Sequence, residues 1–288
     1  MKLKPQPGYQ EQFLSTPADI AIGGGAAGCG KTFSLLLEPL RHIKTYNFSS
    51  TFFRKTRPQI RMQGGLWDAS SEIYSNIPSS KPVESKLNWS FPNRVNIKFN
   101  QLEHEKSVQN YQGAEIPLIC FDELTHFSKN QFFYMLSRNR TTIGIKGYTR
   151  ATCNPDPDSF VRTLIDWWIG PDGFPIAERS GKLRYFMVHE DSYVFGSSYN
   201  EVIEASGGVI KDQIDKINAR TKGAVTITAE HLIKSITFIS GSIYENSELL
   251  RKNPQYLGDL NSLPADQKSR LLDGNWNIRI RATDVVGY

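Results

Sequence analysis

The stretch Gly23–Thr32, with the sequence GGGAAGCGKT, decides the fold of this chain, and it contains G-x-x-x-x-G-K-[ST] in full from Gly25 onward. The apolar run 18–22 before it is typical of a short buried strand, and the run 33–37 after it opens a helix. Glycines let the backbone turn tightly enough for consecutive N–H groups to face a phosphate. The helix N-terminus adds unpaired donors. This context predicts a phosphate-binding loop, the P-loop, rather than a glycine-rich turn that binds nothing.

Individual residues of the loop have expected tasks. Lys31 would reach the β- and γ-phosphates of a nucleotide, and the Thr32 hydroxyl would bind Mg²⁺. The nucleotide contacts expected from this loop are Gly25, Gly28, Cys29, Gly30, Lys31 and Thr32. The position of Cys29 at the start of a helix favours a thiol with a lowered pKa that reacts readily. The alternative is that Cys29, Cys120 and Cys153 are three small buried residues, which we expect for Cys120 and Cys153.

The composition is that of an ordinary globular protein of 288 residues, 39% hydrophobic and 22% charged, which is enough for one large α/β domain with a small appendage. No apolar stretch approaches the roughly 18 residues that a membrane helix needs, and the first residues do not read as a signal peptide. The three cysteines are solitary, match no zinc spacing and fit a reducing cytosol. The net charge of +5 suits a polyanion partner without requiring one.

Strands and helices are expected to alternate along the chain. Besides the strand before the P-loop, the expected strands are 51–55, 116–121, 148–153 and 235–239, with a hairpin formed by 86–91 and 95–99. The expected helices are 31–44, with Pro39 as a kink, 58–75 and 131–137. Strands that alternate with helices predict an α/β fold with a mostly parallel central sheet, wound in βαβ units and flanked by helices.

Two of these strands end in polar residues. The run 116–121 is followed by Asp122 and Glu123. In P-loop NTPases an Asp at this place holds Mg²⁺, and Glu123 fits a base that polarises the attacking water. A Glu beside the Asp favours an ATPase of the additional-strand, catalytic-glutamate type. After the run 148–153, Asn154 would touch the γ-phosphate or the lytic water, although Asn-Pro is also a frequent turn dipeptide.

These residues, together with the N- and C-terminal segments, resemble the N-terminal ATPase domain of the large terminase of tailed phages, the DNA-packaging motor. The segment 7–14 is similar to the adenine-binding segment of that family, with Gln10 as the better match for the adenine-reading glutamine and Gln12 as the alternative. The pattern from Asn246 to Trp276 resembles the helices that close the domain. The resemblance implies binding of ATP and Mg²⁺, and a small helical lid subdomain.

Two departures from the family pattern matter. Large terminases usually continue into a nuclease domain, whereas this chain ends at Tyr288, twelve residues after Trp276. We expect a truncated chain rather than a separate nuclease polypeptide. The only basic residue in the P-loop is Lys31, while some family members carry an arginine there. An arginine from a neighbouring subunit is therefore expected, and either Arg138 or Arg140 could supply it.

The expected organisation is an ATPase core over 1–190, then an insertion, the last core strand and the lid over 191–276, and the start of a linker over 277–288. The resemblance implies a motor ATPase that moves double-stranded viral DNA into a procapsid in the host cell cytoplasm, without entering the mature virion. It implies a portal protein, a small terminase subunit and a homo-oligomeric ring as partners, no membrane, and a domain that can be monomeric in isolation. The alternatives are a nucleotide-binding switch without sustained turnover and a helicase-like translocase.

Overall fold

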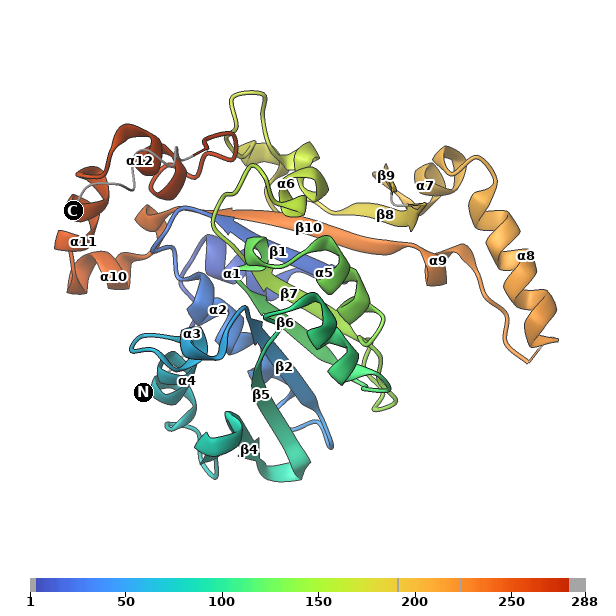
Figure 1. The fold of residues 1–288 in the computed structure, drawn as a ribbon, viewed down its shortest axis with the longest axis horizontal. Coiled ribbons are helices and arrows are strands. Elements are labelled where there is room, and N and C mark those ends of the chain that lie inside the picture. The colour runs from blue at the N-terminus through green and yellow to red at the C-terminus, as the bar shows by residue number, and fades with distance from the viewer. Residues whose placement is uncertain (1–3, 191, 223, 280–288) are drawn as a thin grey trace.

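The computed structural model describes residues 4–190, 192–222 and 224–279. Within these residues the strands form one ten-stranded sheet that runs through the molecule (Figure 1). In spatial order the strands are β3 (Lys81–Val83), β4 (Asn88–Phe91), β5 (Val95–Gln101), β2 (Ser49–Arg54), β6 (Leu118–Asp122), β7 (Tyr148–Thr152), β1 (Ile20–Gly25), β10 (Lys234–Gly241), β8 (Arg184–His189) and β9 (Ser192–Gly196). The strands from β5 to β10 in this order are parallel, and an antiparallel pair is added at each end. The α/β fold and the mostly parallel sheet predicted from the sequence are confirmed.

Helices cover both faces of the sheet, because the central strands are apolar on both sides. In β2, Phe52 packs on one face with α2 (Lys31–Leu37) and α4 (Leu66–Tyr74), whereas Phe53 packs on the other face with α5 (Lys129–Leu136). The helices of the core are α1 (Tyr9–Ser15), α2 (Lys31–Leu37), α3 (Arg57–Arg61), α4 (Leu66–Tyr74), α5 (Lys129–Leu136) and α6 (Phe160–Leu164). The two hydrophobic cores hold the sheet rigid, so that its edge can position a site.

Two helix predictions were wrong in their extent. The helix expected over 31–44 ends at Leu37 and continues as a 3-10 helix, Glu38–His42, that contains Pro39. The helix expected over 58–75 is two helices, α3 and α4, because the chain turns at Gly64 with φ +73°. A Cβ at Gly65 would lie 2.8 Å from the Gln59 carbonyl oxygen, so only glycine fits between the two helices.

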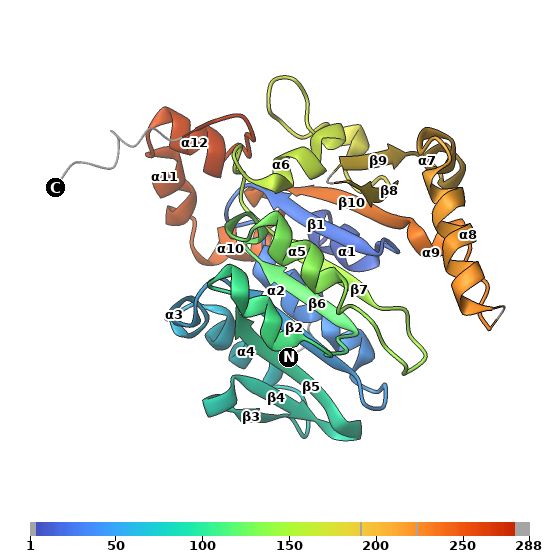
Figure 2. The ribbon, with the colours of Figure 1, turned by 45° about the vertical axis from the view of Figure 1, so that its right-hand side comes forward.

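Two appendages extend from the sheet. The hairpin of β8 and β9 carries α7 (Tyr199–Ala205), α8 (Val209–Thr221) and α9 (Ala229–Leu232), and these form an arm with α8 at its far end (Figures 1 and 2). The arm has its own small core, which includes Met187, Val202 and Ile210. The sequence analysis expects an insertion in this region.

The second appendage follows β10. Helices α10 (Ser247–Lys252), α11 (Gln255–Asn261) and α12 (Ala265–Leu271) pack around Ile243, Leu260 and Leu272, with Ala27 of the P-loop against this cluster. This places the helices expected to form a lid beside the P-loop. The expected linker 277–288 lies outside the described residues from residue 280 on. Across the described residues, no helix combines the length and the apolar character needed to cross a membrane.

Candidate nucleotide site

The carboxyl ends of four parallel strands meet at one edge of the sheet, in the order β2, β6, β7, β1. The P-loop follows β1, Asp122 and Glu123 end β6, and Asn154 follows β7. Strand β7 is inserted between β1 and β6, with register pairs Ile20 to Thr149 and Leu118 to Tyr148. Strand β7 is the additional strand that Asp122 and Glu123 predicted. This strand order brings residues that are far apart in the sequence to one edge of the sheet.

The P-loop adopts backbone conformations that favour glycine. Gly25, Gly28 and Gly30 have φ values of +117°, +79° and +87°. A Cβ at Gly25 would lie 2.7 Å from the Gly241 carbonyl oxygen, so the loop also needs the close approach that glycine allows. The Lys31 ammonium is buried and donates to the carbonyl oxygens of Ala26 at 2.6 Å and Gly25 at 3.3 Å. The lysine thus closes the loop on itself, with its charge where a phosphate would bind.

A candidate site for a hard cation lies beside the loop. The Thr32 hydroxyl donates to Asp122 Oδ1 at 3.4 Å, and the Thr152 hydroxyl donates to the same oxygen at 2.8 Å. Oxygen ligands of this kind are the ones that Mg²⁺ prefers, and it commonly takes few from the protein, with waters and substrate phosphates supplying the rest. Within the described residues, no group of three or more His, Cys, Asp and Glu side chains is placed to hold a metal ion. The pair of Thr32 and Asp122 fits Mg²⁺ held together with a nucleotide.

Glu123 is held next to this pair. It has a left-handed backbone conformation, φ +58° and ψ +60°, which turns its side chain away from the strand direction. The Asn154 side-chain amide donates to its two carboxylate oxygens at 3.0 and 3.2 Å, and the Asn154 backbone N–H adds a contact at 3.3 Å. Burial raises the pKa of Glu123, as does the neighbouring Asp122 charge, while Lys31 and Arg54 oppose the rise. A carboxylate with a raised pKa in a cleft is suited to accept a proton.

Arg54, at the end of β2, is a site residue that the sequence analysis missed. Its Nη1 atom lies 3.4 Å from Asp122 Oδ2 and 3.8 Å from Glu123 Oε1. Nothing in the local sequence distinguishes this arginine from other surface cations. The signal that could have found it is the expectation that the strand 51–55 ends at the same sheet edge as 116–121.

A cleft of about 510 Å³ opens between the P-loop and the lid. Glu123 and Asn154 lie in its wall with Lys31 and Thr32, and Asn246 and Leu249 line its lid side. Asn246 caps α10 and donates to the Gly28 carbonyl oxygen at 2.6 Å, so the first lid helix is bonded to the P-loop. The glycine loop, Lys31, Thr32 and Glu123 thus line one cleft of a size suited to a small ligand.

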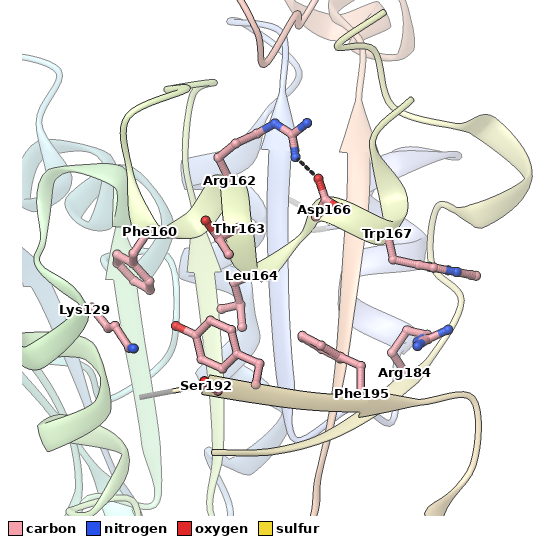
Figure 3. A pocket seen from close by; sticks show the side chains of 11 residues that line it. Lys129, Phe160, Arg162, Thr163, Leu164, Asp166, Trp167, Arg184, Ser192 and Phe195 are labelled. Carbon is pink, nitrogen blue, oxygen red and sulfur yellow. Dashed lines mark hydrogen bonds and ion pairs between the residues drawn. The ribbon is translucent and has the colours of Figure 1, made fainter. Parts of the chain in front are cut away.

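A larger cavity, of about 850 Å³, lies elsewhere, between α6 and the β8–β9 hairpin (Figure 3). It is lined by aromatic and charged side chains, among them Trp167 and Arg184. The Arg184 guanidinium lies over the Trp167 ring, 4.9 Å from its centre, and Arg162 is paired with Asp166. This cavity lacks a glycine loop and a carboxylate pair, so its size does not make it the nucleotide site.

The two candidate adenine-reading glutamines have different surroundings. Gln10 is buried below the P-loop, where its side chain lies close to Gly30 and accepts a hydrogen bond from the Gln6 N–H at 2.9 Å. Gln12 lines a separate cavity, whose wall is formed mainly by residues 174–180 and 240–245. Gln6, which the sequence analysis did not single out, donates to Asn246 Oδ1 at 2.8 Å. The N-terminal segment therefore reaches the lid side of the cleft through Gln6 and Asn246.

Arg138 and Arg140 lie at the opposite edge of the sheet. The Arg138 carbonyl accepts from the Ile116 N–H, and the Arg140 guanidinium donates to the carbonyl oxygens of Gly113 and Ala114, all before β6 begins. Within one chain, these two arginines are separated from Glu123 by the length of β6. Their expected role toward a neighbouring subunit stays a prediction.

The expectation of a reactive Cys29 was wrong. The thiol is buried, and its burial raises the pKa above the ordinary value although Lys31 is close. Cys120 and Cys153 are also buried, with pKa values raised by burial. The helix N-terminus is not sufficient to lower the pKa of a thiol that has lost its contact with water.

Comparison with known proteins identifies the family. The profile of "Terminase large subunit, T4likevirus-type, N-terminal" matches residues 22–283. This chain belongs to that family. The match includes the P-loop, the acidic strand end, the arm and the helices after β10, whereas Gln6 and Gln10 lie before it. No curated protein matches the chain.

Solved large terminases share the fold. The large terminase from a thermophilic bacteriophage is 14% identical, with a TM-score of 0.55 over 95% of this chain and 54% of that one. The same protein in complex with ATP-gamma-S gives 13% identity and a TM-score of 0.53, over 95% of this chain and 53% of that one. The ATPase domain of the Thermus phage P74-26 large terminase is 9% identical, with a TM-score of 0.51 over 96% of this chain and 100% of that one. This terminase chain thus spans about half the length of the thermophilic-phage protein.

Proposed function

We propose that this terminase domain hydrolyses ATP in a Mg²⁺-dependent reaction and that hydrolysis drives the translocation of double-stranded viral DNA into a procapsid. The observation that carries the proposal is that the P-loop, Thr32 and Glu123 line one cleft, with Asp122 hydrogen-bonded to Thr32 beside it. The large terminase of the thermophilic bacteriophage, which has this fold, has been solved with ATP-gamma-S and with ADP.

The residues at the cleft have different roles in phosphoryl transfer. The loop N–H groups and the Lys31 ammonium bind the phosphates, and Lys31 exchanges its contacts with the loop carbonyls for contacts with phosphate oxygens. Thr32 and Asp122 would hold Mg²⁺, which supplies charge neutralisation at the phosphates when bound. Catalysis of this kind depends on positioning and on electrostatic stabilisation of the transferring group.

Glu123 orients and deprotonates the attacking water. Because Asn154 binds both oxygens of the Glu123 carboxylate, Asn154 sets the direction in which that carboxylate faces. Loss of the γ-phosphate would change the contacts of these two residues, and the Gly28–Asn246 hydrogen bond offers a route from the loop to the lid. In a ring of such domains, the lid motion would move DNA through its phosphates, largely without reading sequence.

The same proposal includes the partners of the motor. Double-stranded DNA, a portal protein, a small terminase subunit and further copies of the chain in a homo-oligomeric ring would assemble in the host cytoplasm. Arg138 or Arg140 would then face the nucleotide of a neighbouring copy, since neither lies near its own. A trans arginine of this kind increases the rate of phosphoryl transfer by roughly 10³ or more.

Phosphate release from ATP, measured over a wide range of protein concentrations, tests the proposal. Glu123→Gln should lower turnover about 10²- to 10⁴-fold and retain ATP binding, because it removes the base and keeps the shape. Glu115→Gln is the matched control: this exposed glutamate precedes the same strand at its other end. Tight ATP binding without turnover at any concentration would instead support the nucleotide switch.

A further inference from the structure

The register of the sheet places Arg54 beside Asp122. Strands β2 and β6 are parallel neighbours, with Phe53 opposite Phe121. The next residue on each strand is therefore Arg54 beside Asp122, at the edge where the P-loop also lies. The guanidinium reaches past Asp122 to Glu123, so a third charged side chain stands at the catalytic carboxylates.

The hydrogen-bonding of this guanidinium is incomplete. The Nε and Nη1 atoms of Arg54 are buried and have no hydrogen-bond partner in the described part of the chain. Its contacts with Asp122 and Glu123, at 3.4 and 3.8 Å, are ion pairs at long range. A buried donor without a partner costs about 1–3 kcal/mol. Groups of this kind in a native structure call for an explanation, such as a ligand that completes them.

The two carboxylates do not depend on Arg54 for their position. Asp122 Oδ1 accepts from the hydroxyls of Thr152 and Thr32, and the Glu123 carboxylate accepts from Asn154. The Arg54 side chain is thus charged and largely buried, and neither carboxylate needs it as a hydrogen-bond donor. Because like charges repel, a divalent cation at Asp122 would also weaken the hold of that carboxylate on the guanidinium.

We propose that Arg54 binds the γ-phosphate of ATP within its own subunit, and so supplies the cis arginine that the P-loop lacks. This inference rests on the proposed ATPase function. A guanidinium offers two parallel N–H donors to a phosphate, which a single ammonium does not. Lys31 would then meet the phosphates from the P-loop side and Arg54 from the β2 side. ADP lacks the group that Arg54 contacts, so the residue distinguishes ATP from ADP.

Equilibrium binding of ATP-gamma-S and of ADP to the purified chain tests this inference. In Arg54→Gln, affinity for ATP-gamma-S should fall about 10- to 100-fold, the range expected for hydrogen bonds to a charged group. Affinity for ADP should change less than about twofold. Arg54→Lys should restore part of the lost affinity, since it keeps the charge but not the two parallel donors. Arg61→Gln is the matched control, because Arg61 is exposed and paired with Glu84 away from the cleft.

Equal losses for the two nucleotides, or no loss for either, would overturn the role of Arg54. If Arg54→Gln does not fold, as judged by thermal unfolding, the ratio of the two affinities in Arg54→Lys decides instead. An unchanged ratio in that variant overturns the inference, and a ratio shifted against ATP-gamma-S supports it. Phosphate release by the unmodified chain is measured separately, so that a failure of the ATPase proposal is distinguishable from a failure at Arg54.

Discussion

Arg54 and Arg150 lie on strands of the same sheet and differ in how much of each guanidinium is hydrogen-bonded. Near the amino edge, both Nη atoms of Arg150 donate, to the carbonyl oxygens of Ala18, Thr149 and Thr16, and only its Nε, which faces the Glu38 carboxylate at 3.6 Å, has no hydrogen-bond partner among the described residues. At the carboxyl edge, Arg54 has ion pairs, but its buried Nε and Nη1 atoms both lack a hydrogen-bond partner within the same residues. The comparison teaches that burial alone does not reveal the role of an arginine. The Arg150 guanidinium is bonded mainly to the backbone of the fold, whereas we propose that the Arg54 guanidinium binds a ligand.

The largest effect should come from Arg150→Met. Glu38 is fully buried, and removing its buried partner leaves only the more exposed Arg41 to balance its charge, which costs about 3–5 kcal/mol of unfolding free energy. Urea unfolding measures this loss. The ratio of ATP-gamma-S to ADP affinity should stay unchanged in the folded fraction. A loss below about 1 kcal/mol would show that the two arginines do not differ as their surroundings suggest.

A smaller effect is expected at the carboxyl edge from Thr152→Val. This change keeps the shape of the side chain and removes the 2.8 Å hydrogen bond to Asp122. A hydrogen bond to a charged group contributes about 1.5–3 kcal/mol, and thermal unfolding without Mg²⁺ should show a loss in that range. An unchanged midpoint would mean that the Thr32 hydroxyl holds Asp122 without Thr152.

Arg138→Ala and Arg140→Ala should change stability by no more than about 0.5 kcal/mol, because both side chains are at the surface. Nucleotide binding by the dilute chain should not change, since both arginines lie far from their own cleft. Suppose that one of these arginines acts on a neighbouring subunit. The rate per subunit of the unmodified chain should then rise with protein concentration, and the variant should show reduced turnover only in that concentration range. A defect in the dilute, monomeric chain would contradict a role in trans.

The smallest expected effect is on the cysteines. All three thiols are buried and have raised pKa values, so a thiol reagent at pH 8 should label none of them in the folded chain within minutes. The same reagent should label three per chain in urea. Rapid labelling of one thiol in the native state would place Cys29 in a more open loop than the structure has.

The sequence predicted most of the nucleotide site, because its motifs combine local geometry with chemistry. The P-loop, Asp122 and Glu123, and Asn154 each follow a strand, and parallel strands bring their carboxyl ends together. Arg54 was not predicted as a site residue because its position beside Asp122 depends on β2 and β6 being neighbours. The order of strands in a sheet cannot be predicted from any one segment of the sequence. The break between α3 and α4 escaped for a local reason, since Gly64 reads as tolerable in a helix until its positive φ is known.

The pairing of β1 with β10 also bears on how the chain is made. Ile20 is opposite Ile236, and the Ala26 N–H donates to the Gly241 carbonyl oxygen at 3.1 Å, so the P-loop rests on a strand more than 200 residues later. During synthesis the nucleotide loop cannot reach its final form until residue 241 has left the ribosome. Contacts this distant in sequence also slow folding. Competence to bind nucleotide should therefore arise late, when nearly the whole domain has emerged.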